Sequence, residues 1–184
     1  NVRKKKDKAL IYYEHKFNNN LKIIPSKKEI QKSIRSLRPE IKKAIDETYK
    51  RVKDWHVKQK PKDIFYNNKL KNKFYYKNKA IKSTACYVPG NLPSTLLMCA
   101  TPAIIAGVKR IVLCTPSLNG KLNGAVYYAA SILGIKEFYS LGGASAIMAL
   151  ATGTPKVKSV DKIVGPGSKW VALAKKKVFL EGLC

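Results

Sequence analysis

The first third of the chain repeats apolar positions with the period of an α-helix. Residues 2–17 show this spacing, with Val2, Ala9 and Leu10 among the apolar positions. Ser26 and Glu29 match a capping box, in which the Ser oxygen accepts a free backbone N–H and the Glu side chain reaches back. Pro39 suits the first turn of a third helix, whose apolar face comprises Ile41, Ala44, Ile45, Thr48, Val52 and Trp55. The pattern therefore predicts three helices before residue 58.

Residues 58–80 break this helical pattern. They are rich in Lys and Asn and contain two aromatic clusters, Phe65-Tyr66 and Phe74-Tyr75-Tyr76. This composition predicts irregular structure or a short hairpin. Aromatic rings among lysines can stack on nucleic-acid bases. More commonly they pack a small sheet onto a helix, and that packing is our expectation here.

From Tyr87 onward, short β-like runs alternate with apolar helices and short connections. Such alternation predicts a parallel sheet covered on both faces, with right-handed crossovers. Pro102 falls inside the first of these helices, where we expect a bend, and Gly107 ends it. The β runs are residues 110–115, 138–141 and 162–164, and the helices are residues 93–106, 122–133, 144–151 and 168–180. The predicted class is α/β, a parallel-sheet domain preceded by a mainly helical N-terminal segment.

Three loops follow strands at the edge of the sheet where ligands usually bind. They are Thr115-Pro116-Ser117, Leu141-Gly142-Gly143 and Gly165-Pro166-Gly167. Glycine lets a backbone turn sharply and lets a ligand approach, and a following helix directs free N–H groups at the same place. Ser145 and Ser168 lie in the first turns of such helices. Neither glycine loop is a G-x-G-x-x-G or Walker loop, so nucleotide binding and compact chain reversal both remain open, and the serines could equally be helix caps.

The formal net charge is +26, from 37 Lys and Arg against 11 Asp and Glu. A strongly basic chain invites a nucleic-acid interpretation. The excess is nearly all Lys, however, whereas bidentate contacts to phosphates and bases favour Arg. Residues 1–86 carry 26 basic and 8 acidic side chains, together with many Asn, Ile and Tyr residues. We interpret the excess as solvated compositional drift, with a polyanion-binding surface as the alternative.

Four cysteines, Cys86, Cys99, Cys114 and Cys184, show no C-x-x-C spacing. This usage suits a reducing compartment, and a zinc site made from these thiols with His15 and His56 is not expected. His56 lies at the end of an amphipathic helix, and we interpret it as a structural residue, packed or capping, and not as a ligand. No apolar run reaches the roughly 18 residues of a membrane span, and no leader is evident. The chain begins at Asn1 and stops directly after a predicted helix, so we expect it to be a piece of a longer protein.

Several motifs, in order along nearly the whole chain, closely resemble those of histidinol dehydrogenases. Upstream, they include K-D-K-A-L at 6–10 and Trp55-His56 followed by Gln59. The others are Y-V-P-G at 87–90, L-P-S-T at 92–95, A-I-I-A-G-V at 103–108, L-G-G-A-S-A-I-M-A-L-A-T-G-T-P-K-V at 141–157 and V-D-K-I-V-G-P-G-S-K-W-V-A-L-A-K-K-K-V at 160–178. The order and number of the motifs make a chance similarity improbable.

The resemblance implies NAD-dependent oxidation of L-histidinol to L-histidine in histidine biosynthesis. It also implies a zinc-dependent, cytoplasmic homodimer with two Rossmann-like domains. By this resemblance residues 87–184 form the Rossmann-like dinucleotide-contacting domain. Residues 1–86 form the helical start of a first α/β domain that later sequence completes.

Three cofactor-binding positions carry over from the resemblance: Tyr87, Ser145 and Ser168. Tyr87 keeps the family residue, whereas Ser145 stands where the family has Gln and Ser168 where it has Asn. A Ser hydroxyl offers fewer hydrogen bonds than either amide, so we expect weaker cofactor contacts. The zinc ligands and the catalytic Glu-His pair are expected beyond Cys184, which leaves no catalytic or metal-binding residue in this chain. The alternatives are a basic nucleic-acid-binding module and an inactive pseudogene product on the same scaffold.

Overall fold

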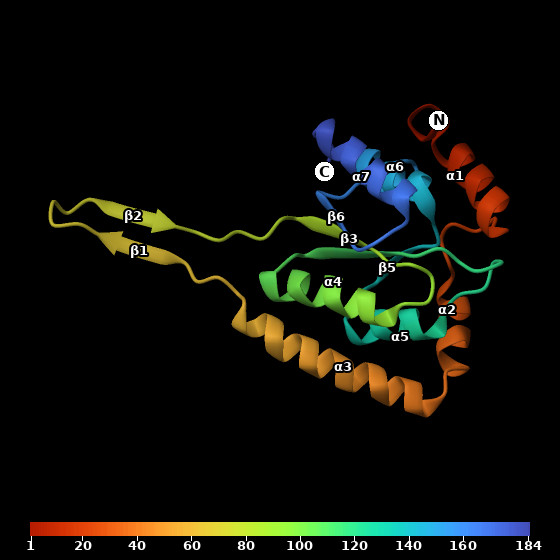
Figure 1. The fold of residues 1–184 in the computed structure, drawn as a ribbon, viewed down its shortest axis with the longest axis horizontal. Helices are drawn as coiled ribbons and strands as arrows, with labels where there is room; N and C mark the ends of the chain where they lie inside the picture. Colours follow the sequence, from red (N-terminus) through yellow and green to blue (C-terminus); the bar gives the residue numbers. More distant parts are fainter.

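The computed structural model describes residues 1–184, and its centre is a four-stranded parallel sheet with helices on both faces (Figure 1). The strand order is β5-β4-β3-β6. The strands are β3 (Ser83–Tyr87), β4 (Arg110–Cys114), β5 (Glu137–Tyr139) and β6 (Lys162–Val164). The predicted α/β class, a parallel sheet preceded by a mainly helical segment, is confirmed.

The N-terminal helices are α1 (Val2–Asn18), α2 (Lys27–Arg35) and α3 (Pro39–Lys58), as the pattern predicted. The capping box is confirmed: the Glu29 N–H donates to Ser26 Oγ at 3.3 Å, and the Ser26 N–H donates to Glu29 Oε2 at 2.7 Å. Pro39 is the first residue of α3, where its missing N–H costs no helical hydrogen bond. The sequence did not reveal the kink in α1 at Lys6, where the backbone is non-helical with φ 47°.

Strand β3 is the element that the sequence pattern missed. All five of its residues, Ser83–Tyr87, are buried, so the strand shows no apolar-polar alternation to detect. It lies inside the sheet, paired in parallel with β4 (Tyr87 opposite Cys114) and with β6 (Cys86 opposite Val164). The predicted division between residues 86 and 87 lies within this strand.

The second half supplies the helices α4 (Pro93–Ala106), α5 (Gly124–Ile132), α6 (Gly143–Thr152) and α7 (Lys169–Leu180). Gly107 ends α4 in the left-handed conformation, as predicted. Helices α3, α4 and α5 pack together on one side of the sheet, and α1, α6 and α7 on the other (Figure 1). No helix is both long enough and apolar enough to span a membrane.

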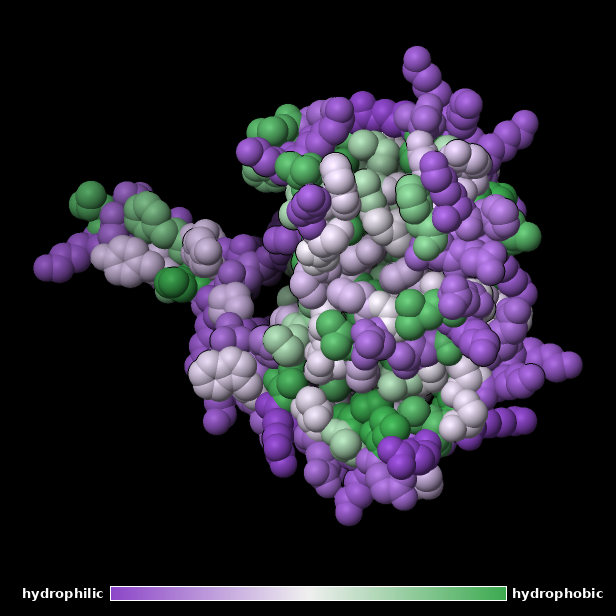
Figure 2. All heavy atoms as spheres, turned by 45° about the vertical axis from the view of Figure 1, so that its right-hand side comes forward, coloured by the Kyte–Doolittle hydropathy of each residue, from purple (hydrophilic) through white to green (hydrophobic).

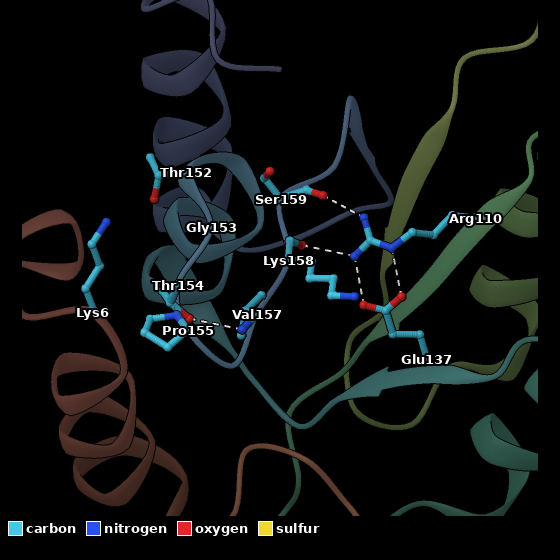
Figure 3. A pocket seen from close by; sticks show the side chains of 10 residues that line it. All are labelled: Lys6, Arg110, Glu137, Thr152, Gly153, Thr154, Pro155, Val157, Lys158 and Ser159. Atoms are coloured by element: carbon cyan, nitrogen blue, oxygen red, sulfur yellow. Dashed lines mark hydrogen bonds and ion pairs between the residues drawn. The ribbon is translucent and has the colours of Figure 1, made fainter.

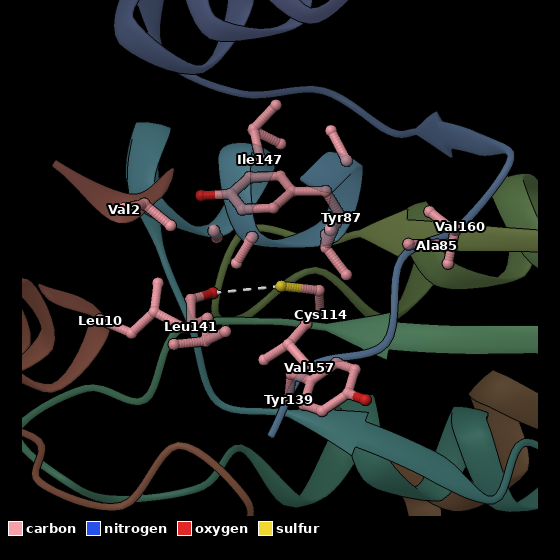
Figure 4. Packing of buried hydrophobic residues seen from close by; sticks show 14 of the residues in the cluster. Val2, Leu10, Ala85, Tyr87, Cys114, Tyr139, Leu141, Ile147, Val157 and Val160 are labelled. Atoms are coloured by element: carbon pink, nitrogen blue, oxygen red, sulfur yellow. Dashed lines mark hydrogen bonds between the residues drawn. The ribbon is translucent and has the colours of Figure 1, made fainter. Parts of the chain in front are cut away.

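Side-chain alternation along the strands divides the core into two clusters, one on each face of the sheet. Ala85 and Tyr87 of β3 enter the cluster beneath α1, α6 and α7, whereas Cys86 between them enters the other. Figure 4 shows part of the first cluster, where Tyr87 lies with Cys114 of β4 and Ile147 of α6. The first cluster therefore joins the carboxyl ends of the strands to the start of α6.

A hairpin arm projects from the body between α3 and β3 (Figures 1 and 2). Its strands, β1 (Ile64–Asn67) and β2 (Lys73–Tyr76), pair in antiparallel fashion, which confirms the predicted hairpin. The expectation that its aromatic rings pack a small sheet onto a helix is wrong. The rings contact one another across the strands, with centroids of Phe65 and Tyr75 at 5.4 Å, and all five remain 54–64% exposed. The arm extends past the end of α3, so no helix lies beneath it.

Candidate functional site

A groove opens at the carboxyl edge of the sheet, between α1, α6 and α7. Its volume is about 830 Å³. Its lining is mainly apolar, with polar groups at the first turns of α6 and α7. The lining includes Tyr13, Glu14 and Phe17 of α1, Gly143 and Ser145 of α6, and Ser168 and Trp170 at the start of α7. Concave, mostly apolar sites with a few polar groups are typical of small-molecule binding.

Tyr87, Ser145 and Ser168, the three residues predicted to contact the cofactor, lie close together, but only the two serines face the groove. Ser145 and Ser168 both line the groove. Tyr87 is only 5% exposed and lies behind the wall, where its hydroxyl oxygen accepts a hydrogen bond from the Gly143 N–H at 3.1 Å. Burial raises the pKa of Tyr87, while the bond from Gly143 opposes that change. Tyr87 therefore supports the groove from within, and the two serines face it.

Two helix N-termini meet at this groove with free backbone donors. The N–H groups of Ala144 and Ser145 in α6 have no acceptor in the chain, and neither have those of Lys169 and Trp170 in α7. Neither serine caps its helix: the Ser145 hydroxyl donates to the Gly142 carbonyl at 3.0 Å, and Ser168 makes no capping bond. The open helix ends can therefore donate to a bound molecule.

The glycines of the two loops differ in what lies beside them. A Cβ on Gly165 would meet the Tyr87 carbonyl oxygen at 2.0 Å, and one on Gly167 would meet Val171 Cγ1 at 2.3 Å. A Cβ on Gly143 would meet nothing within 4 Å. Compact chain reversal thus explains the glycines of the β6–α7 loop. Gly143, in contrast, faces empty space in the groove, where a ligand could approach its backbone.

Aromatic rings of α1 and α7 form walls of the groove. Tyr13 and Phe17 are stacked, with centroids 6.2 Å apart and planes 9° from parallel. Phe17 is 71% exposed, and Trp170 is 62% exposed with Lys169 Nζ 5.3 Å from its ring centroid. Exposed ring faces beside free hydrogen-bond donors suit a flat heterocycle that carries polar groups.

Glu14 is a groove residue that sequence reasoning missed. It is 1% exposed, and its carboxylate accepts hydrogen bonds from the Gly142 N–H at 2.7 Å and from Asn18 Nδ2 at 2.8 Å. Burial raises the pKa of Glu14, and the bonds from Gly142 and Asn18 partly offset that change. A signal was present, because Glu14 follows the buried Leu10 by one helical turn and so shares its apolar face.

A second hollow lies at the opposite, amino-terminal edge of the sheet (Figure 3). There the Arg110 guanidinium donates to both carboxylate oxygens of Glu137, at 2.7 and 2.8 Å, and to the Ser159 carbonyl at 2.6 Å. Arg110 holds the pKa of Glu137 below its usual range. These groups satisfy one another, so the pair ties the α6–β6 connection to the sheet and leaves the carboxyl-edge groove as the candidate site.

Comparisons with known proteins agree on one family. The histidinol dehydrogenase family model matches residues 1–182. The chain belongs to the histidinol dehydrogenase family. A histidinol dehydrogenase from Pelagibacter ubique is 54% identical over 181 residues, covering 97% of this chain and 42% of that protein. One from Mesorhizobium japonicum is 40% identical over 185 residues, covering 97% of this chain and 43% of that protein.

The crystal structure of histidinol dehydrogenase from Elizabethkingia anophelis matches the whole chain with a TM-score of 0.94 and 34% identity. This chain covers 44% of that one. It thus spans less than half the length of the relatives that it matches.

The residues of this chain do not fit a zinc site. No group of three or more His, Cys, Asp or Glu side chains is placed to hold a metal ion. The four cysteines are free, and burial raises the pKa of Cys86 to about 12 and that of Cys114 further. None of the four thiols belongs to such a group.

Proposed function

We propose that this chain is the cofactor-contacting part of a histidinol dehydrogenase that oxidises L-histidinol to L-histidine with NAD. The supporting observation is the groove in which two open helix N-termini, Ser145, Ser168 and exposed aromatic rings face one space. This assignment places the reaction in histidine biosynthesis and the protein in the cytoplasm. Bound NAD would supply the hydride acceptor for the alcohol and then for the aldehyde.

The groove's residues match the chemistry of a dinucleotide. The N–H groups of Ala144, Ser145, Lys169 and Trp170 and the two serine hydroxyls can hydrogen-bond to ribose or phosphate oxygens. The ring faces of Phe17 and Trp170 can stack on a base. Tyr87 holds the Gly143 N–H, and through it the first turn of α6. The chain's part in the reaction is thus to bind and orient the cofactor.

The chemical step belongs to the part of the relatives that this chain does not span. By the family resemblance, the zinc ligands and the Glu-His pair lie there, so we propose that residues 1–184 alone do not catalyse the oxidation. We also propose that residues 87–184 form a Rossmann-like dinucleotide-contacting domain, that residues 1–86 begin a first α/β domain, and that the full-length protein is a homodimer. Helix α1 of the first part lines the groove, so both parts contribute to the site.

The test uses the full-length protein, with calorimetric titration of NAD and measurement of NADH formed from histidinol. Changing Ser145→Gln together with Ser168→Asn adds longer amide side chains, which should strengthen NAD binding by about 1–3 kcal/mol at roughly 0.5–1.5 kcal/mol per hydrogen bond. Ser131→Gln is a matched control because the Ser131 hydroxyl also donates to a carbonyl three residues back, that of Tyr128 at 2.7 Å, but lies on α5 outside the groove.

The control should leave NAD affinity unchanged. A full-length protein that neither binds NAD nor reduces it with histidinol would contradict the proposal. In that case, association with single-stranded RNA that weakens steeply with salt would favour the basic-module alternative. Absence of both activities would favour an inactive gene product.

A further inference from the structure

The start of α6 is held from two sides by side chains of other elements. The Gly142 N–H donates to Glu14 of α1, and the Gly143 N–H donates to Tyr87 of β3. The next two N–H groups, of Ala144 and Ser145, remain free on the groove side. A carboxylate of the chain itself therefore lies at a helix end that commonly attracts a ligand's phosphate.

We propose that Glu14 is a positioning and specificity-determining residue of this groove, whose buried carboxylate fixes the β5–α6 loop and excludes anionic groups from the tip of α6. The inference rests on the proposed function and specifies the chemistry of the bound molecule. The part of the cofactor that lies against Gly143–Ser145 is uncharged, a sugar or a flat ring, and not a phosphate.

The carboxylate of Glu14 has no cationic partner. Its oxygens are bonded to a backbone N–H and to an amide, and none of the ion pairs in the chain includes Glu14. The Arg and Lys side chains that line the groove are engaged elsewhere, since Arg3 pairs with Glu181 and Lys177 Nζ lies 3.9 Å from the same carboxylate. Both hydrogen-bond partners of Glu14 are donors, which favours the ionised carboxylate despite its burial, so the partial positive charge of the α6 N-terminus is opposed by one negative charge. A second anion close by would meet a like charge in a partly buried site, where repulsion is strong.

The loop that Glu14 holds has little freedom to move. A Cβ on Gly142 would lie 3.0 Å from both Asn18 Nδ2 and Pro116 Cβ, so the loop is packed between α1 and the β4–α5 connection. On its other side the Ser140 N–H donates to the Ile23 carbonyl at 2.7 Å, and Asn20 Nδ2 donates to the Ser140 carbonyl at 3.2 Å. The position of the free donors of α6 therefore depends on contacts with α1 and with the segment that follows it, and Glu14 makes the one that reaches the first residue before α6.

Glu14 also lies on the same helix as the aromatic wall. Tyr13 and Phe17 flank it in sequence and present stacked rings to the groove. An uncharged ring or sugar against α6 would satisfy both features, because it can stack on the rings and hydrogen-bond to the free N–H groups without an added negative charge.

The experiment compares two substitutions in the full-length protein. Glu14→Gln keeps an oxygen that can accept from the Gly142 N–H but removes the charge, whereas Glu14→Leu removes both. Glu47→Gln, at an exposed position of α3, is the matched control for loss of a negative charge. Calorimetric titrations with adenosine, AMP and NAD at two salt concentrations give the affinities.

We expect Glu14→Gln to tighten AMP relative to adenosine by about tenfold at low salt, with a smaller gain at high salt, because a like charge is removed. Glu14→Leu should weaken adenosine and NAD alike, because the loop is released. Glu47→Gln should leave the ratio of AMP to adenosine affinity at the wild-type value. If Glu14→Leu fails to fold, the Glu14→Gln titrations still decide the question.

An unchanged AMP-to-adenosine ratio in Glu14→Gln, in a protein that binds NAD, would overturn this inference and leave the proposed function standing. A wild-type protein that binds none of the three ligands would overturn both.

Discussion

The β5–α6 and β6–α7 loops look alike in sequence but make different use of glycine. Each joins a short parallel strand to a helix that has a Ser at its start, Ser145 in the first turn of α6 and Ser168 at the N-cap of α7. In the β6–α7 loop, Gly165 and Gly167 lie so close to Tyr87 and Val171 that a side chain at either position would clash with them. In the β5–α6 loop, Gly142 is also closely packed, with an added Cβ 3.0 Å from Asn18 and Pro116, but Gly143 adjoins open space within the groove. A glycine-rich turn after a strand is thus no evidence of a ligand until the neighbouring atoms are known.

The largest expected effect is that of Gly165→Ala. Its φ is 110°, and the added Cβ would lie 2.0 Å from the backbone oxygen of Tyr87 in the central strand β3, which cannot move aside cheaply. Backbone strain and overpacking should together lower the free energy of unfolding by about 3–5 kcal/mol. Urea denaturation of the full-length protein measures this loss.

Gly134→Ala is the matched control for Gly165→Ala. Gly134 also has a positive φ, 70°, but nothing lies within 4 Å of an added Cβ. Its loss should reflect strain alone, about 1–2 kcal/mol. Equal losses at the two positions would show that the β6–α7 loop is not tightly packed on β3.

The class of fold and most elements could be predicted from the sequence because their signals are local. Ser26 with Glu29, Pro39 and Gly107 each mark a helix end by their own chemistry. Strand β3 was missed because both of its faces are buried, so apolar and polar residues do not alternate along it. The exposure of the arm's rings was also missed, because the sequence does not show where a hairpin points.

The candidate site was predictable only in part. The family resemblance brought Ser145 and Ser168 together, and the structure places both on one groove. It could not show that Tyr87 lies behind the wall, because that depends on the packing of α6 over β3. Glu14 belongs to a helix 128 residues away in sequence from the loop that it holds, and no local motif links them.

Gly167→Ala should have an intermediate effect, because it tests close packing without a positive φ. The added Cβ would meet Val171 Cγ1 at 2.3 Å and Val171 Cβ at 2.5 Å. Val171 is 2% exposed, and rotation of its side chain cannot relieve the contact with Cβ, which is fixed to the helix backbone. We expect a loss of about 1–3 kcal/mol in the free energy of unfolding, measured by urea denaturation. The loss should be smaller in a Val171→Ala background, where Cγ1 is absent, and an equal loss in both backgrounds would mean that the contact with Val171 Cγ1 is not the cause.

Gly143→Ala should have the smallest effect on stability and a distinct effect on binding. Its φ is 64° and its Cβ would meet no atom, so the unfolding free energy should fall by about 1–2 kcal/mol, as for Gly134→Ala. The new methyl group would stand beside the free N–H groups of Ala144 and Ser145, however, where a ligand is proposed to lie. NAD affinity, measured by titration of the full-length protein, should therefore fall in Gly143→Ala and stay constant in Gly134→Ala. If both variants kept wild-type affinity, the open space at Gly143 would not be where the cofactor binds, and the two loops would differ in packing alone.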